Sequence, residues 1–208
     1  MVRANPERRQ ALLDASIEVL ARDGARGLTF RAVDKEAGVP AGTASNYFVN
    51  RDDLLVQVGH RYYERLIPGE DVVAQSRQKQ TRESMTELMT DVVERVTGFR
   101  TGYLAILELR LEATRRPELQ DLLTERVRAD LDFNVANYRE TGLPGGDDTV
   151  ALLYLALNWL ILDRLTLPGI FDESRAADLV RIAVDRVIPD DAQAQEVNPP
   201  VGRCPTSP

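Results

Sequence analysis

Apolar residues recur at helical spacing along most of the chain. Residues 6–23 carry such a stripe, formed by Leu12, Ala15, Val19 and Leu20. No stretch of useful length alternates apolar and polar residues as a strand would, and we find no internal repeat. The pattern predicts an all-α fold of about nine helices. They are expected over residues 6–23, 30–37, 40–47, 51–67, 81–98, 101–115, 118–141, 147–166 and 172–187.

Glycines and capping residues divide this pattern into elements. Gly24 and Gly27 are expected to end the first helix. Thr29 is expected to cap the second, because its hydroxyl can accept a bond from a free N–H of the first turn. Gly38 is expected to end that second helix, since glycine tolerates a positive φ. Asn50 is expected to cap the long helix that follows.

Three regions follow from this division. Residues 1–50 are expected to form a small three-helix domain and residues 51–188 a larger helical bundle. Residues 189–208 hold five Pro and no aromatic residue, which predicts a disordered tail. The charges divide similarly: residues 1–51 carry a net charge of +2 and residues 52–208 one of −9. A net negative charge argues against unspecific binding to nucleic acid, but it does not exclude one localised docking face.

The composition removes several classes of protein. The 208 residues include one Cys, Cys204, and one His, His60. These numbers exclude a disulfide framework and a Cys-rich or His-rich metal site. No acid–base constellation surrounds either residue, so we expect no enzyme, no metal and no cofactor.

No targeting or membrane segment is evident in the sequence. Residues 1–10 are polar and lack the apolar core of a signal peptide. The run Val150–Leu162 is shorter than the ~20 apolar residues of a membrane span, and Asn158 lies within it. We therefore expect a buried helix there and a cytoplasmic protein.

The segment 28–54 carries the most specific chemistry. Two short helices joined by a tight turn at Gly38 and Val39 predict a helix-turn-helix, whose second helix can enter a DNA major groove. Short side chains at its surface let the backbone approach base edges, and the amide of Asn46 suits adenine. A helix N-terminus such as that at Thr29 attracts phosphate. The DNA-contacting residues expected from this chemistry are Thr29, Pro40, Ala41, Gly42, Thr43, Ser45, Asn46, Tyr47 and Arg51.

Residues 9–56 resemble the DNA-binding region of the TetR family of bacterial transcriptional regulators. The resemblance rests on Ala11, Ala15, Gly27, Thr29, Arg31, Val33, Ala37, Gly38, Val39, Gly42, Thr43, Tyr47, Phe48, Arg51 and Leu54. It implies a homodimer that reads a palindromic operator in double-stranded DNA. It also implies a C-terminal domain that binds a small-molecule effector, which releases the DNA. By position, residues 40–48 form the recognition helix, and Thr29, Arg31, Tyr47 and Arg51 hold the DNA backbone.

Some positions depart from the family pattern or allow two interpretations. Ala41 stands where a basic residue is frequent, and Ser45 stands where Tyr is usual. Asp34 replaces a small residue, and it either supports the recognition helix electrostatically or weakens the packing between helices. Arg51 is either a phosphate contact or a solvated charge at a helix start. Phe48 is expected in the core.

The C-terminal body contains a helix that is apolar on nearly all faces, over residues 150–166. Such a helix must be covered on most sides. Together with residues 172–187 it is the expected homodimer interface, as the resemblance also implies; the alternative is a helix buried within one chain.

The effector pocket is expected among the middle helices, where the family places it. Candidate lining residues are Met85, Met89, Phe99, Tyr103, Leu107, Phe133, Tyr138, Tyr154, Asn158 and Trp159. Glu108 and Glu112 are expected to be surface or interface charges; if either faced the pocket, it would favour a cationic effector. His60 is expected near the domain junction.

These observations predict a ligand-responsive, dimeric transcriptional repressor. The alternative is a DNA-binding regulator or activator that needs no ligand.

Overall fold

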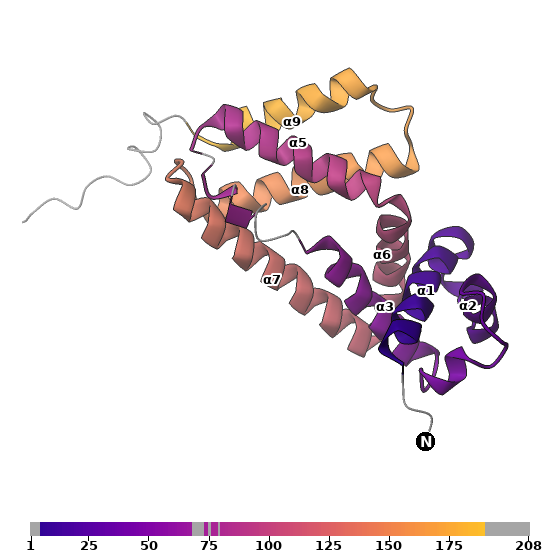
Figure 1. Cartoon of the computed structure of the whole chain (residues 1–208). Helices are drawn as coiled ribbons and strands as arrows, with labels where there is room; N and C mark the ends of the chain where they lie inside the picture. Colours follow the sequence, from indigo (N-terminus) through magenta and orange to yellow (C-terminus); the bar gives the residue numbers. More distant parts are fainter. Residues whose placement is uncertain (1–4, 68–72, 75, 79, 190–208) are drawn as a thin grey trace, which may run out of the picture.

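The computed structural model describes residues 5–67, 73–74, 76–78 and 80–189. Within these ranges the chain is all-α and contains no strand, as predicted. The nine expected helices correspond to eight α-helices and one short 3-10 helix (Figure 1). Their bounds are α1 Pro6–Gly27, α2 Phe30–Glu36, η1 Ala44–Asn46, α3 Arg51–Leu66, α5 Arg82–Gly98, α6 Arg100–Ala113, α7 Pro117–Thr141, α8 Asp147–Thr166 and α9 Glu173–Val187.

The helix α1 continues past the first of the two glycines that were expected to end it. Gly24 has φ +68° and ψ −179°, so the helix kinks there and adds a further turn up to Gly27. A residue with a side chain would be strained in this left-handed region. Of the two glycines expected to end this helix, Gly24 interrupts it after residue 23 and Gly27 is its last residue.

The larger correction concerns the expected recognition helix over residues 40–47. The structure has turns there and then η1, with no α-helix. Gly42 has φ +89°, which interrupts a right-handed helix. The Ala44 N–H also donates to the side chain of Asp34, where in an α-helix it would donate to the carbonyl of Pro40.

The helix α6 lies between the N-terminal helices and the layer formed by α5, α8 and α9 (Figure 1). It makes its most extensive packing with α1, and it also contacts α3, α5 and α7. The main hydrophobic core runs from α1 and α3 through α6 into α8 without a break. A second cluster lies among α5, α7, α8 and α9 and includes Met85, Tyr138 and Val184.

The helix α8 is longer than the apolar run seen in the sequence. Asp147–Thr166 is long and apolar enough, by length and composition alone, to cross a membrane. The apolar run Val150–Leu162 is part of this longer helix, so its own shortness does not exclude a span. The helix packs against α5, α7 and α9 but keeps other side chains exposed, so it is only in part the buried helix expected from the sequence.

Candidate DNA-binding surface and ligand cavity

The first helix of the helix-turn-helix is capped as predicted. The hydroxyl of Thr29 accepts a hydrogen bond from the Ala32 N–H at 3.2 Å. At the other end Gly38 adopts φ +64°, and the Val39 N–H donates to the Asp34 carbonyl at 3.0 Å. The turn between the two elements is therefore built from local hydrogen bonds, and contact of Thr29 with phosphate stays a prediction.

Asp34 holds the recognition segment in place. Its side chain is 2% exposed, and its two carboxylate oxygens accept from the N–H groups of Gly42 and Ala44, each at 2.7 Å. A carboxylate that accepts two main-chain bonds makes charge-assisted contacts, which are stronger than neutral ones. Of the two interpretations of Asp34, the supporting one is therefore observed.

The short polar side chains of the recognition segment bond back to their own backbone. The Thr43 hydroxyl donates to the Pro40 carbonyl at 2.5 Å, and the Ser45 hydroxyl donates to the Gly42 carbonyl at 2.8 Å. The Asn46 amide donates to the same Gly42 carbonyl at 3.1 Å. All of these side chains are exposed or half-exposed, and each keeps hydrogen-bonding capacity beyond the bond it makes to the backbone.

The remaining predicted DNA-contacting residues divide between surface and scaffold. Arg31, Pro40 and Ala41 are exposed, and Tyr47 is half-buried. Arg51 donates to the main-chain carbonyls of Ala25 and Leu28, at the end of α1. This contact joins α3 to α1 and is neither of the two roles expected from the sequence; a contact of Arg51 with phosphate stays a prediction. Phe48 is buried, as predicted.

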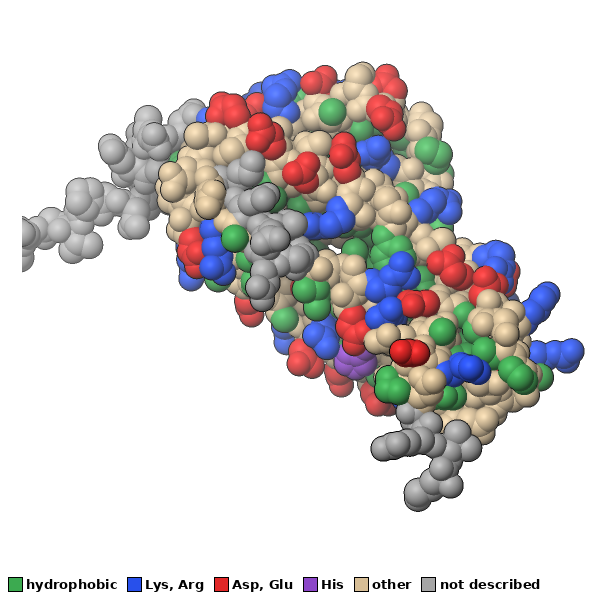
Figure 2. All heavy atoms as spheres, viewed as in Figure 1, with side chains coloured by type: hydrophobic (Ala, Val, Ile, Leu, Met, Phe, Trp, Pro, Cys, Tyr) green, Lys and Arg blue, Asp and Glu red, His purple; other side chains and the backbone are tan. Residues whose placement is uncertain are grey.

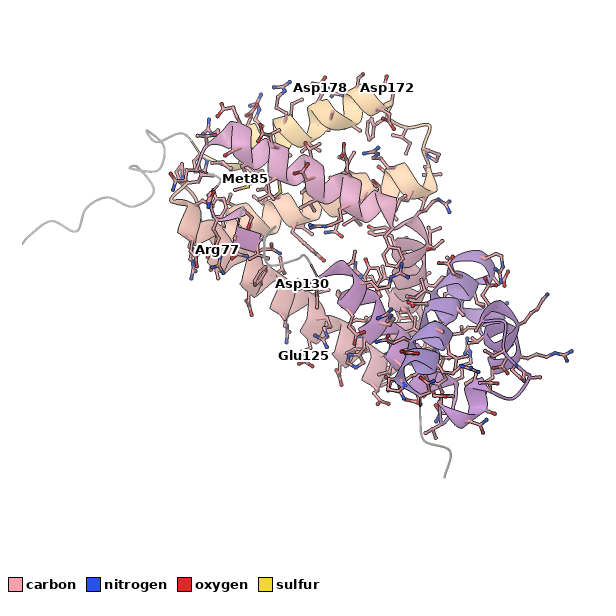
Figure 3. All side chains as sticks on the ribbon, in the orientation of Figure 1. Arg77, Met85, Glu125, Asp130, Asp172 and Asp178 are labelled. Atoms are coloured by element: carbon pink, nitrogen blue, oxygen red, sulfur yellow. The ribbon has the colours of Figure 1, made fainter. Side chains whose placement is uncertain are left out.

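A cavity of about 330 Å³ lies among α3, α5, α6, α7 and α8. Figure 2 shows a hollow near the centre of this face, bordered by hydrophobic and basic side chains. Eight of the ten residues expected to line a pocket do line it: Met85, Met89, Tyr103, Leu107, Phe133, Tyr138, Tyr154 and Asn158. Figure 3 labels Met85 on α5 and Asp130 on α7, which belong to two of its walls.

Two expected lining residues lie elsewhere. Trp159 is 67% exposed on the outside of α8, because consecutive helical residues point about 100° apart and Asn158 already faces the cavity. The Phe99 ring stacks on that of Tyr62, with ring centroids 6.2 Å apart. The guanidinium carbon of Arg65 lies over the Phe99 ring, 4.0 Å from its centroid. Both predictions of a lining role were wrong.

Several lining residues were missed by the sequence analysis. Tyr62 and Tyr63 on α3 line the cavity, and so do the charged residues Arg95, Arg110 and Asp130. A charged residue on an amphipathic helix carries no sequence signal that separates a cavity wall from solvent. The adjacent tyrosines on α3 were the one available signal.

Several polar groups of the cavity are tyrosine hydroxyls. The Tyr103 hydroxyl donates to the Asn158 carbonyl at 3.1 Å, and the Tyr138 hydroxyl donates to the Pro144 carbonyl at 2.7 Å. Burial raises the pKa of both hydroxyls, and it raises the pKa of Tyr63 to about 12. These phenols therefore stay protonated and act as hydrogen-bond donors near neutral pH.

The face of α6 that points away from the cavity bonds to the N-terminal helices. Glu108 accepts from the Ala25 N–H at 2.9 Å, next to the kink at Gly24. Because Arg110 lines the cavity and Glu108 contacts α1, one short helix touches both candidate sites. Glu108 is therefore an interface charge, as one of the expectations had it, and it does not line the cavity.

Glu112 is buried, so it is not one of the surface charges that the sequence allowed. It is 8% exposed and pairs with Arg115 at 2.6 Å and with Arg116. Arg116 also pairs with Asp52 of α3 at 2.8 Å. Burial acts to raise the pKa of Glu112, but the hydrogen bond from Arg115 and the charges of Arg116 and Arg115 outweigh it and lower that pKa.

The outer face of α8 carries an apolar stripe. Leu152, Leu155 and Trp159 lie at helical spacing and are 53, 62 and 67% exposed. Large exposed side chains in a continuous row are typical of an interface.

Two other predictions concern single residues. His60 is half-exposed on α3 and its Nδ1 is 3.2 Å from the Arg126 guanidinium of α7, and its place near the domain junction stays a prediction. Among the described residues no group of His, Cys, Asp and Glu could hold a metal ion, and Cys204 lies outside them.

Comparison with known proteins places these features in a family. The family model of "Bacterial regulatory proteins, tetR family" matches residues 12–58, and that of the "Tetracyclin repressor-like, C-terminal domain" matches residues 80–190. The transcriptional repressor KstR of Mycolicibacterium smegmatis is 36% identical over 63 residues, which are 30% of this chain and 31% of KstR. The chain thus spans about a third of the length of the first curated relatives it matches.

Solved structures match over nearly the whole chain. A TetR-family member from Streptomyces coelicolor A3 is 28% identical, with a TM-score of 0.67 over 89% of this chain and 100% of that one. The multidrug binding protein EbrR complexed with ethidium is 29% identical, with a TM-score of 0.62 over 88% of this chain and 99% of that one. The two matched regions include the helix-turn-helix and most of the helical body, and the chain belongs to the TetR family of bacterial helix-turn-helix transcriptional regulators.

Proposed function

We propose that this chain is a transcriptional repressor that binds a palindromic operator as a homodimer and is released when a small molecule enters the cavity. The observation that carries the proposal is the position of α6. Its Arg110 lines the cavity, while its Glu108 is bonded to α1 of the helix-turn-helix. The protein would act in the cytoplasm, where bacterial DNA lies.

The DNA-binding part of the proposal rests on the surface around η1. Small exposed residues such as Ala41 and Gly42 allow a close approach to the bases, and Asn46 supplies an amide for base recognition. The N-terminus of α2 at Thr29 and the exposed Arg31 suit phosphate. We expect Tyr47 to contact the DNA backbone, with Pro40, Thr43 and Ser45 at the same surface.

The homodimer is supported by the apolar stripe on α8. Leu152, Leu155 and Trp159 expose more apolar surface than an isolated chain would keep in water. Aromatic residues such as Trp159 are frequent anchors of interfaces. Pairing of α8 and α9 with their copies in a second chain would bury this stripe and would place two recognition segments on one duplex.

Release by a ligand is supported by the size and lining of the cavity. Small-molecule sites usually enclose about 300–1,000 Å³ and are mostly apolar with a few polar groups, which describes this one. The complex of EbrR with ethidium supports the view that a protein of this fold binds an aromatic small molecule. The cavity also favours a ligand-responsive regulator over the alternative that needs no ligand, which a closed bundle would favour.

In this mechanism the ligand acts by preference for one spacing of the recognition segments. The operator requires half-sites about 34–36 Å apart, one helical turn of DNA. A ligand that binds better to a dimer with another spacing lowers operator affinity by its differential affinity for the two states. A shift of α6 would reach α1 through Glu108, and α3 through Arg116.

Selection of duplexes from a random pool, with the purified full chain, tests the proposal. We expect a palindromic consensus that is bound about 1,000-fold or more tightly than random duplex. Selected sequences with no two-fold symmetry, or no preference over random duplex, would contradict it.

A further inference from the structure

We propose that the cavity is built for an organic anion, with a flat or extended apolar body and one carboxylate-type head group held by Arg110. The inference rests on the proposed function only in that it takes this cavity to be the effector site. It adds the chemical class of the effector, which the comparisons leave open.

Arg110 has no carboxylate partner among the described residues, in contrast to several other arginines of the body. Arg61 pairs with Asp14, Arg116 with Glu112 and Asp52, and Arg139 with Asp147. Across the described ranges no ion pair or hydrogen bond joins the Arg110 guanidinium to another side chain. Arg110 lines the cavity and is also exposed to solvent. A cation there without a protein partner is placed to receive an anion.

The acidic residues near the cavity do not neutralise this cation. Glu108 precedes Arg110 on α6 and Glu112 follows it. The Glu108 carboxylate accepts from the Ala25 N–H, and the Glu112 carboxylate pairs with Arg115 and Arg116. Asp130 is the one acid of the lining, and the cation that acts on its pKa is Arg126. Arg110 and Arg95, both exposed to solvent, outnumber Asp130 among the charged residues of the lining, which therefore has an excess of positive charge.

The tyrosines add hydrogen-bond donors to this end of the cavity. No residue in the described segments accepts a hydrogen bond from the hydroxyls of Tyr62, Tyr63 or Tyr154. Burial raises the pKa of Tyr62, Tyr63 and Tyr103, and the charge of Arg110 opposes that rise in each case. Arg110 and these phenols line the same cavity, where the charge of Asp130 acts on Tyr62 and Tyr63 in the opposite sense to Arg110. The guanidinium and the protonated phenols are hydrogen-bond donors, and they favour a ligand rich in acceptors.

The rest of the lining sets the body of the ligand. Apolar side chains from four helices form most of the wall: Met89, Ile106, Leu107, Phe133, Leu153 and Leu157. A cavity of about 330 Å³ is large enough for a bicyclic aromatic or a medium alkyl chain. An aromatic or aliphatic carboxylate combines such a body with one strong acceptor.

Three naphthalene compounds of one shape and different charge test the inference. Calorimetry with the full chain compares 2-naphthoate, the neutral 2-naphthylmethanol and the cationic 2-naphthylmethylammonium. We expect naphthoate to bind at least about 10-fold more tightly than either of the others, because hydrogen bonds to a charged group are the stronger ones.

Two arginine variants with the same change of charge then locate the head group. Arg110→Gln should weaken naphthoate about 10-fold or more and change naphthylmethanol less than about threefold. Arg128→Gln is the matched control, since Arg128 is exposed on α7 and does not line the cavity, and it should leave all three affinities unchanged. Because Arg110 has no protein partner, its replacement should leave the melting temperature unaltered.

Several results would overturn the inference. They are an equal or greater affinity for the ammonium compound, naphthoate binding no tighter than naphthylmethanol or absent, and an equal loss for acid and alcohol in Arg110→Gln. Duplex binding in the same preparation separates this failure from that of the proposed function. If duplex binding and its release by another compound persist, only the ligand class is wrong; if duplex binding is absent, the calorimetry still decides the ligand class.

Discussion

The carboxylate of Glu108 accepts a hydrogen bond from the main-chain N–H of Ala25, at 2.9 Å and across 83 residues of sequence. Ala25 follows the kink at Gly24, where the backbone bonding of α1 is interrupted. The bond therefore satisfies a donor that the kink would leave unpaired, and it attaches α6 to the helix-turn-helix at that point. A movement of α6 on its cavity side would reach α1 here.

Removing this acceptor should reduce both stability and coupling. Glu108→Ala leaves the buried Ala25 N–H without a partner, so we expect a loss of about 1–3 kcal/mol in the free energy of unfolding. Urea unfolding measures it. Glu108→Gln keeps an acceptor oxygen and should lose less. An alanine variant as stable as the parent would show that the bond contributes nothing.

Asp34 should be essential to the recognition segment. Asp34→Ala removes the acceptor of two main-chain N–H groups, and we expect a loss of about 2–4 kcal/mol of stability together with weaker operator binding. Glu36→Ala is the control, because Glu36 forms only an exposed pair with Arg22 and should lose about 0–1 kcal/mol. Similar losses for the two variants would refute the role given to Asp34.

Most helix bounds outside the recognition segment could be predicted to within a few residues because their signals are local. Thr29 and Asp172 cap the helices that follow them, and Gly142 ends α7 in the left-handed conformation that glycine tolerates. The family motif around Gly38 likewise identified the helix-turn-helix. These signals act within a few residues of the position they determine.

The failures come from contacts between residues distant in sequence or side by side on a helix. Asp34 takes backbone N–H groups that a recognition helix would use, and no pattern of hydrophobicity reports this. Trp159 and Asn158 are adjacent, and only the packing of α8 decides which of them faces the cavity. The roles of Glu108 and Arg110 could not be predicted either, because they depend on α1 on one side of α6 and on the cavity on the other.

Base recognition and backbone contact should separate in two variants. Asn46→Ala should reduce operator affinity by about 1–3 kcal/mol and relax preference at one position in each half-site. Arg51→Ala should weaken all sequences alike and, because Arg51 also bonds to the end of α1, lower the melting temperature. Equal losses on operator and random duplex for Asn46→Ala would contradict its role.

The ion pairs of the buried Glu112 with Arg115 and Arg116 should make the free energy of unfolding depend on pH. Because the folded-state pKa of Glu112 lies below its usual value of 4.5, its ionised form stabilises the fold above that pH. This contribution is lost as the pH falls through the folded-state pKa. The stability difference between the parent and Glu112→Gln should therefore be largest near pH 7 and shrink below about pH 4.5. A difference constant over this range would exclude an ionised Glu112 as the cause.

Sedimentation equilibrium of the full chain with its selected duplex tests the central claim most directly. Pairing through the apolar stripe of α8 predicts a dimer in solution and two chains on each palindromic duplex. Leu155→Glu should yield single chains that bind the duplex weakly, because it places a charge in the buried stripe. A parent chain that stays monomeric and leaves every duplex unbound would contradict the account.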